Sequence, residues 1–171
     1  MIAMTSGNQR AFDTRQDTTQ PRATVLCAIR GGPFSQYTVQ RAMQIAQERH
    51  ARLVFLYVVD AEFLGYATVG RPRVVLRELR TTGEFMMSIL RDRAIRQGVD
   101  ADYVVRTGDV RRQIVESVRW QDADVLVMGR PIRSPGSDTF TEETLAEFVD
   151  RVVTKTGVEV VLADTTVALP E

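Results

Sequence analysis

Short apolar runs alternate along this chain with longer stretches in which apolar residues recur every three or four positions, and this alternation constrains the fold more than any other feature. Runs of this length and composition are typical of β-strands covered on both faces. They lie at residues 24–29, 52–59, 100–106, 123–129 and 158–163. The run at 100–106 is the most polar of them, so we expect it to lie nearer an edge of the sheet.

The longest helical stretch follows the second predicted strand. Its periodicity predicts a helix from about Val74 to Gln97. Gly83 lies inside this stretch, where a glycine costs about 1 kcal/mol of helix stability relative to alanine. The residues expected on the inner side of the helix are Leu79, Met86, Met87, Leu90 and Ala94.

Polar residues and a glycine mark the ends of the other predicted helices. A first helix follows Ser35, and Asp109 is a typical N-cap for the helix after the third strand. Thr139 and Glu142 have the spacing of a capping box for the last helix, which Gly157 ends.

Strands that alternate with helices predict an α/β fold with right-handed crossovers. We therefore expect a single doubly wound domain at 23–165, in which five parallel strands form one sheet with helices on both faces. Residues 1–22 are polar and lack a sustained period, which favours a flexible N-terminal extension. Residues 166–171 form a short C-terminal tail.

The charge balance argues against two classes of partner. Lys plus Arg and Asp plus Glu both total 22, so the chain has no net charge to favour nucleic acid or an anionic membrane surface. No apolar run approaches the ~20 residues of a membrane span, and the N-terminus lacks the apolar core of a secretory signal. We expect a cytoplasmic protein.

Catalytic and metal-binding groups are scarce. Cys27 is the only cysteine and lies in an apolar run, which is typical of a small buried thiol. His50 is the only histidine and falls just before the second strand, on the opposite side of the sheet from the crevice where ligands of this fold bind. Ser35 therefore has no histidine to activate it. We expect no enzymatic activity and no metal.

The candidate binding site lies in the loops that follow the first and fourth strands, because ligands of doubly wound sheets bind where the strand order reverses. Its candidate residues are Arg30, Gly31, Gly129, Arg130, Arg133, Gly136 and Ser137. The three arginines would suit a phosphate, an acidic metabolite or a carboxylate of a partner. The alternative is a set of solvated arginines paired with nearby carboxylates of Asp138, Glu142 or Glu143.

Two segments of the chain resemble the universal stress protein family. Residues 24–59 combine a strand, a Gly-containing turn, Ser35, an alanine-bearing helix and a second strand. Residues 104–129 resemble the family's second half, with a glycine after strand three and Val-Met-Gly at the end of strand four. The resemblance implies the strand order 3-2-1-4-5 and a homodimer paired through the fifth strand.

One branch of this family binds ATP through Gly-x2-Gly-x9-Gly-Ser/Thr after strand four, where bare backbone approaches the phosphates. Here Gly129 supplies the first glycine, but Ile132 takes the second position and Glu142 and Glu143 take the last two. Arg30 replaces the aspartate that the family's nucleotide binders carry after strand one. These departures predict that ATP binds weakly or not at all.

The sequence thus favours a module of stress response or signalling that acts by dimerisation and by binding a partner protein, without a cofactor. The alternative is a nucleotide-binding switch, in which a loop at 129–140 rebuilt around Gly136 and Ser137 holds AMP or ATP.

Overall fold

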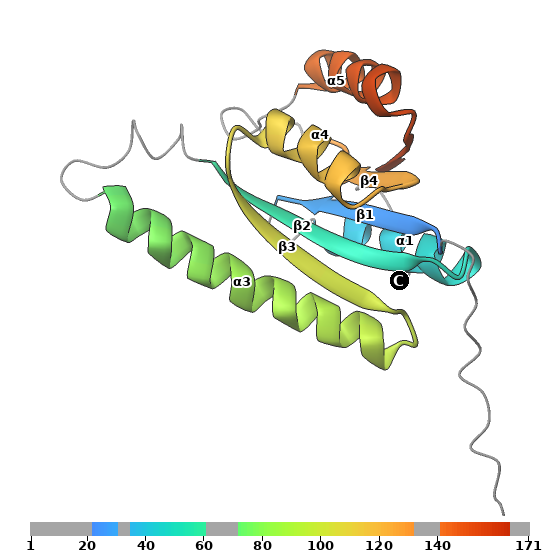
Figure 1. The fold of residues 1–171 in the computed structure, drawn as a ribbon, viewed down its shortest axis with the longest axis horizontal. Helices are drawn as coiled ribbons and strands as arrows, with labels where there is room; N and C mark the ends of the chain where they lie inside the picture. The colour runs from blue at the N-terminus through green and yellow to red at the C-terminus, as the bar shows by residue number, and fades with distance from the viewer. Residues whose placement is uncertain (1–21, 31–34, 61–71, 132–140, 165–171) are drawn as a thin grey trace, which may run out of the picture.

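The computed structural model describes residues 22–30, 35–60, 72–131 and 141–164. Its strands are β1 (Thr24–Ile29), β2 (Arg52–Asp60), β3 (Ala101–Gly108), β4 (Val125–Gly129) and β5 (Glu159–Ala163). Its helices are α1 (Ser35–Glu48), α3 (Pro72–Arg96), α4 (Val110–Trp120) and α5 (Glu142–Thr156). All strand pairs are parallel and the order is β3-β2-β1-β4-β5, which confirms the predicted topology (Figure 1).

Helices cover both faces of this sheet and form two cores. Alternate residues of a strand point to opposite faces, so Cys27 and Phe55 join the core under α1 and α3, whereas Leu26 and Leu56 join the core under α4 and α5. Both cores draw on the same strands, which explains why these strands are apolar without a gap. Figure 1 shows the two layers on either side of the sheet.

Polar groups fix where several elements begin and end. The carboxylate of Asp124 accepts the backbone N–H of Thr24 at 2.8 Å and so ties the start of β1 to the start of β4. Asp109 is the N-cap of α4, as predicted, and Gly157 ends α5 in the left-handed region with φ 72°. The N-cap of α5 is Thr141, two residues later than the predicted Thr139.

The long helix α3 packs on β2 and β3. The prediction of which of its residues face the sheet was partly wrong. Met87 and Ala94 are fully buried, but Leu79 and Met86 are 38% and 36% exposed. Gly83 has a packing role, because a Cβ atom at this position would lie 2.6 Å from Cδ1 of Tyr57. Glycine therefore lets the helix approach the sheet closely.

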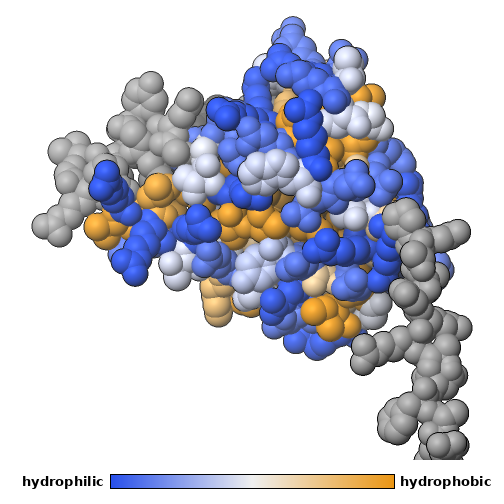
Figure 2. All heavy atoms as spheres, viewed as in Figure 1, coloured by the Kyte–Doolittle hydropathy of each residue, from blue (hydrophilic) through white to orange (hydrophobic). Residues whose placement is uncertain are grey.

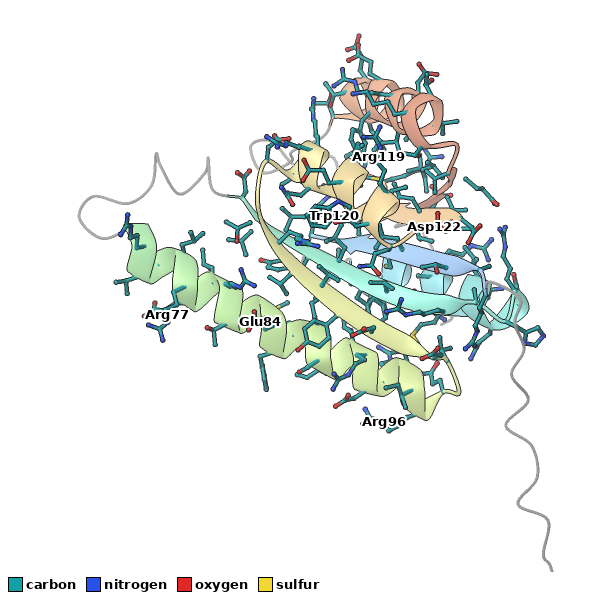
Figure 3. The ribbon with its side chains drawn as sticks, viewed as in Figure 1. Arg77, Glu84, Arg96, Arg119, Trp120 and Asp122 are labelled. Atoms are coloured by element: carbon teal, nitrogen blue, oxygen red, sulfur yellow. The ribbon has the colours of Figure 1, made fainter. Side chains whose placement is uncertain are left out.

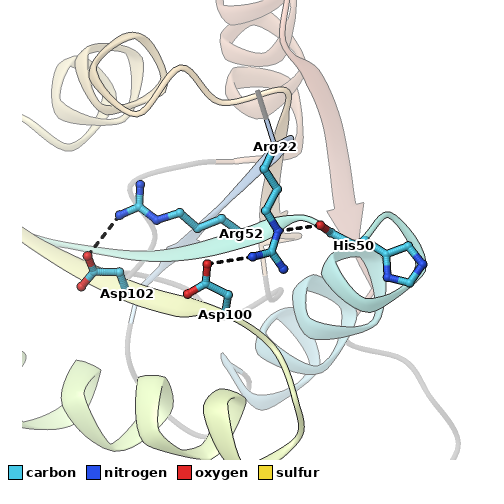
Figure 4. Close-up of polar contacts among 5 residues, drawn as sticks. All are labelled: Arg22, His50, Arg52, Asp100 and Asp102. Atoms are coloured by element: carbon cyan, nitrogen blue, oxygen red, sulfur yellow. Dashed lines mark hydrogen bonds and ion pairs between the residues drawn. The ribbon is translucent and has the colours of Figure 1, made fainter. Parts of the chain in front are cut away.

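The chain enters the domain at the amino ends of the strands. Arg22, counted above with the extension, donates from Nε to the backbone oxygen of His50 at 2.7 Å and from Nη1 to Asp100 at 2.9 Å (Figure 4). Arg52 and Asp102 pair beside it, between β2 and β3, at 3.1 Å. Among the described helices, none is both long and apolar enough to cross a membrane.

Candidate functional site

The candidate site lies at the carboxyl ends of β1 and β4, the strands between which the order reverses. The register of β1 and β4 pairs Ala28 with Met128. Continuing that register by two residues places Arg30 beside Arg130, just beyond the ends of the two strands. The structure thus brings together two of the predicted arginines by backbone position.

Gly129 makes a close contact that does not involve a ligand. A Cβ atom on this residue would lie 2.7 Å from Oγ1 of Thr38, which is buried in α1. Such a distance is far inside ordinary contact, so the helix can pack against the end of β4 only if residue 129 has no side chain. Packing alone is therefore a sufficient reason for the glycine that begins the nucleotide motif.

Arg130 is engaged by a carboxylate at the end of β5. Its Nε lies 2.6 Å from Oδ1 of Asp164, and its backbone N–H donates to the backbone oxygen of Ala163 at 3.0 Å. The Arg130 side chain is 50% exposed and the Asp164 side chain 68%, so water screens the pair and its contribution to stability is small. The pair nonetheless directs the guanidinium toward β5 and compensates its charge.

The N-terminus of α5, where the family motif would place its last Gly-Ser, is capped by its own side chains. Thr141 accepts the backbone N–H of Thr144 at 3.2 Å, and the Thr144 hydroxyl oxygen accepts the backbone N–H of Thr141 at 2.8 Å. This reciprocal capping box satisfies N–H groups that would otherwise be available to an anion.

The carboxyl ends of the strands, where the structure describes them, carry charges of both signs. Asp60 ends β2, Asp109 caps α4 and Asp164 follows β5, while Arg30 and Arg130 follow β1 and β4. A phosphate there would meet carboxylates as well as guanidinium groups. No group of three potential metal-ligating His, Cys, Asp or Glu side chains occurs in the described ranges.

Several predicted site residues lie outside the described residues, so their place at the crevice stays a prediction. They are Gly31, Arg133, Gly136 and Ser137. The alternative partners Asp138 and Glu142 also have no described side chain. The site as described is therefore built from Arg30, Gly129 and Arg130.

Three contributors to the site were not recognised in the sequence. Thr38 was hidden in a helical stripe, and its role depends on how closely α1 approaches β4. Asp164 carried a signal, because a β4–β5 register extended by one residue pairs it with Arg130. Thr144 lies three residues after Thr141, but Thr139 and Glu142 offered the more familiar capping pattern.

The groups most often used in catalysis lie elsewhere. The backbone of His50 is left-handed, with φ 51°, and it follows α1 at the amino end of the sheet, opposite the crevice. Cys27 is fully buried on β1, and desolvation raises the pKa of its thiol well above the usual range. A buried neutral thiol is a poor nucleophile.

Comparison with known proteins identifies the family. The sequence profile of the universal stress protein family matches residues 21–163, and the chain belongs to this family. It is also 30% identical over 127 residues to the sensor protein KdpD of Mycobacterium tuberculosis. That match covers 73% of this chain but 13% of KdpD, so the chain spans only a small part of that relative.

Solved structures of the family share the fold. The universal stress protein UspA of Lactobacillus plantarum superposes with a TM-score of 0.62 at 19% identity, covering 84% of this chain and 99% of that one. A universal stress protein in complex with cAMP gives 0.52 at 23% identity, covering 84% and 98%. A universal stress protein from Archaeoglobus fulgidus in complex with dAMP gives 0.52 at 14% identity, covering 84% and 98%.

Proposed function

We propose that this chain is a cytoplasmic signalling module of the stress response, which acts by pairing with itself and with a partner protein and has no tight ATP site or catalytic activity. The observation that carries this proposal is that Gly129, at the end of β4, and Arg130, just after it, both make contacts within the chain. Gly129 accommodates Thr38, and Arg130 pairs with Asp164. Neither contact needs a nucleotide.

The sequence after Gly129 supports the same conclusion. Ile132 has a β-branched side chain where the family motif needs bare backbone, and Pro131 lacks an N–H donor. Glu143 adds negative charge to the first turn of α5, where it stabilises the helix and repels a polyphosphate. The similarity to a segment of a sensor protein supports a regulatory role.

The proposed self-association uses the edge strand β5. Glu159 donates its N–H to Asp124, and the oxygen of Ala163 accepts from Arg130, so residues 159, 161 and 163 direct their backbone groups toward β4. Val160 and Leu162 alternate with them and direct theirs toward the outer edge. An antiparallel β5 of a second copy would satisfy these groups and bury an otherwise exposed edge.

A second candidate function is nucleotide-dependent switching, which the cAMP and dAMP complexes of structurally similar proteins favour. In this alternative, a loop built on Gly136 and Ser137 holds the phosphate, and Arg30 and Arg130 supply charge. The two functions differ in whether a nucleotide binds at micromolar concentration.

Isothermal titration calorimetry with ATP, AMP and cAMP separates them. The proposed function predicts no saturable binding at micromolar nucleotide. Asp164→Asn removes the charge that engages Arg130, so this variant should bind AMP more tightly than the wild type if the ion pair limits anion binding. Micromolar affinity for ATP in the wild type, lost in Gly136→Val, would show that the alternative is right.

Sedimentation at low micromolar concentration tests the β5 contact. Val160→Pro removes an outward N–H and should give a folded monomer, because an edge strand tolerates proline on its free side. Val161→Pro is the contrasting variant, since it removes an N–H that points to β4 and should lower stability instead. A monomeric wild type, or a Val160→Pro variant that dimerises like wild type, contradicts the proposed contact.

A further inference from the structure

The outer side of α3 carries apolar side chains that no described element covers. Phe85 is 67% exposed and Ile89 is 48% exposed, although both are large and lie one helical turn apart. Figure 2 shows orange apolar atoms interrupting the hydrophilic surface along this helix, and Figure 3 shows Arg96 pointing away from the sheet at its end. The buried side of α3 is formed instead by Gly83, Met87 and Ala94.

Between Glu78 and Arg96, six residues lie within about 40° of one direction at 100° per residue, and they define this outer stripe; Val74 continues the same line toward the start of α3. In chain order the six are Glu78, Thr82, Phe85, Ile89, Asp92 and Arg96. They span about 27 Å of helix at a rise of about 1.5 Å per residue. The spacing of four, three, four, three and four residues reads the same in both directions.

The chemistry of the outer stripe is complementary to its own reverse. When a second α3 runs antiparallel, with its centre at Met87, Glu78 faces Arg96 at each end of the pair. Phe85 faces Ile89 twice in the middle. These matches place opposite charges at the ends and apolar side chains at the centre, as in stable antiparallel helix pairs.

The remaining pair on the stripe is also compatible. Thr82 faces Asp92, whose Oδ1 already accepts from Arg91 within the same helix at 2.9 Å. The hydroxyl of Thr82 can donate to the other carboxylate oxygen. Among the described residues, neither the Glu78 nor the Arg96 side chain takes part in a hydrogen bond or ion pair of its own domain, so the pairing breaks no described side-chain contact of these two.

We infer that the outer stripe of α3 binds the same stripe of a second copy in the antiparallel orientation. A parallel arrangement places Glu78 against Glu78 and Arg96 against Arg96, which is repulsive. An unrelated apolar partner would account for Phe85 and Ile89 but would not require the charges to be self-complementary. The interface is small, so the self-association is weak and concentration-dependent.

This contact goes beyond the β5 pairing of the proposed function and does not depend on it. The helix α3 packs on β2 and β3 at one side of the sheet, whereas β5 forms the opposite edge (Figure 1). A chain that uses both two-fold contacts forms assemblies larger than a dimer. The α3 contact is therefore measured in the Val160→Pro variant, where the β5 contact is removed.

The test is a charge exchange followed by sedimentation over a concentration series up to the near-millimolar range. Glu78→Arg and Arg96→Glu each replace two attractive contacts by two repulsive ones, and each should weaken self-association about 10-fold. An equimolar mixture of these two variants should recover association, because every repulsive pair becomes attractive in the mixed dimer. Arg77→Glu, also on α3 but about 100° away from Glu78, is the matched control and should have no such effect.

A second pair of variants tests the apolar centre. Ile89→Asp should weaken self-association more than about 30-fold, because it places a charge at the middle of the contact. Ile95→Asp is the control, since Ile95 is 52% exposed but lies about 120° around the helix from Ile89. Circular dichroism checks that each variant keeps its helices. The inference is overturned if the mixture fails to recover association, if Ile95→Asp weakens it as much as Ile89→Asp, or if the Val160→Pro variant stays monomeric throughout.

Discussion

Replacing Gly129 by alanine tests whether this glycine serves packing or a phosphate. The added Cβ would lie 2.7 Å from Oγ1 of Thr38, whereas ordinary contact begins at 3.4 Å. Thr38 is 4% exposed and held in α1, so the strain cannot be relieved by turning the side chain into solvent. Overpacking of this kind costs about 1–3 kcal/mol.

A gain in backbone entropy opposes this cost. Alanine is better than glycine inside a strand by about 0.5–1 kcal/mol. The net change for Gly129→Ala is therefore a loss of about 0–2.5 kcal/mol of unfolding free energy. At about 2–4 °C of Tm for each kcal/mol, the central expectation is a fall of about 3–5 °C.

A double-mutant cycle isolates the contact. In Thr38→Ala, the nearest remaining atom to the new Cβ is Cβ of residue 38 at 4.0 Å, which is ordinary contact. Gly129→Ala should then stabilise this variant by about 0.5–1 kcal/mol, giving a coupling of about 1–3 kcal/mol. Thr38→Val keeps a group where Oγ1 lies and should not rescue. Urea unfolding at neutral pH measures all six proteins, which are the three residue-38 backgrounds with and without Gly129→Ala. Additive effects of the two alanine substitutions would refute the packing role.

Three further substitutions or reactions follow from the same structure. Gly83→Ala gains about 1 kcal/mol of helix propensity but clashes with the Tyr57 ring, so thermal unfolding should show a net loss of about 0–2 kcal/mol; clear stabilisation would contradict the close approach. Glu159 is bonded to both Nη1 and Nη2 of Arg49, and this hydrogen bonding lowers its pKa. The stabilisation from this pair is present above the unfolded-state pKa of Glu159 and is lost as pH falls through its folded-state pKa. Glu159→Gln should therefore cost about 0.2–1 kcal/mol of unfolding free energy at neutral pH and less near pH 3. A difference in urea unfolding that does not change with pH would contradict this role of Glu159. Cys27 should react with a thiol reagent only as the protein unfolds, and rapid modification of the native chain would contradict its burial.

The sheet could be predicted from sequence because strand burial leaves a local signal. Each apolar run became a strand, and the polarity of 100–106 correctly placed β3 at an edge. Periodicity was less reliable for α3, where Leu79 and Met86 lie at the border of the apolar stripe. A helix beside an edge strand is covered over less of its circumference than one above the centre of a sheet, so border residues stay exposed.

The site was harder to predict because its contacts join distant parts of the chain. Sequence reasoning identified Gly129 from the family motif and Arg130 from its place after the fourth strand, and both lie where the topology places the crevice. The side chains that engage them, Thr38 and Asp164, come from α1 and from the residue after β5. No local pattern encodes the close approach at Thr38. The partner of Arg130 could have been found by extending the strand register across β4 and β5.

The reciprocal capping of Thr141 and Thr144 has a consequence for how this crevice can change. Because α5 begins with bonds between its own residues, the start of the helix needs no contribution from the loop before it or from a bound anion. The first turn of α5 should therefore tolerate changes of sequence before Thr141, so that β4 and α5 can keep their places while the residues between them change.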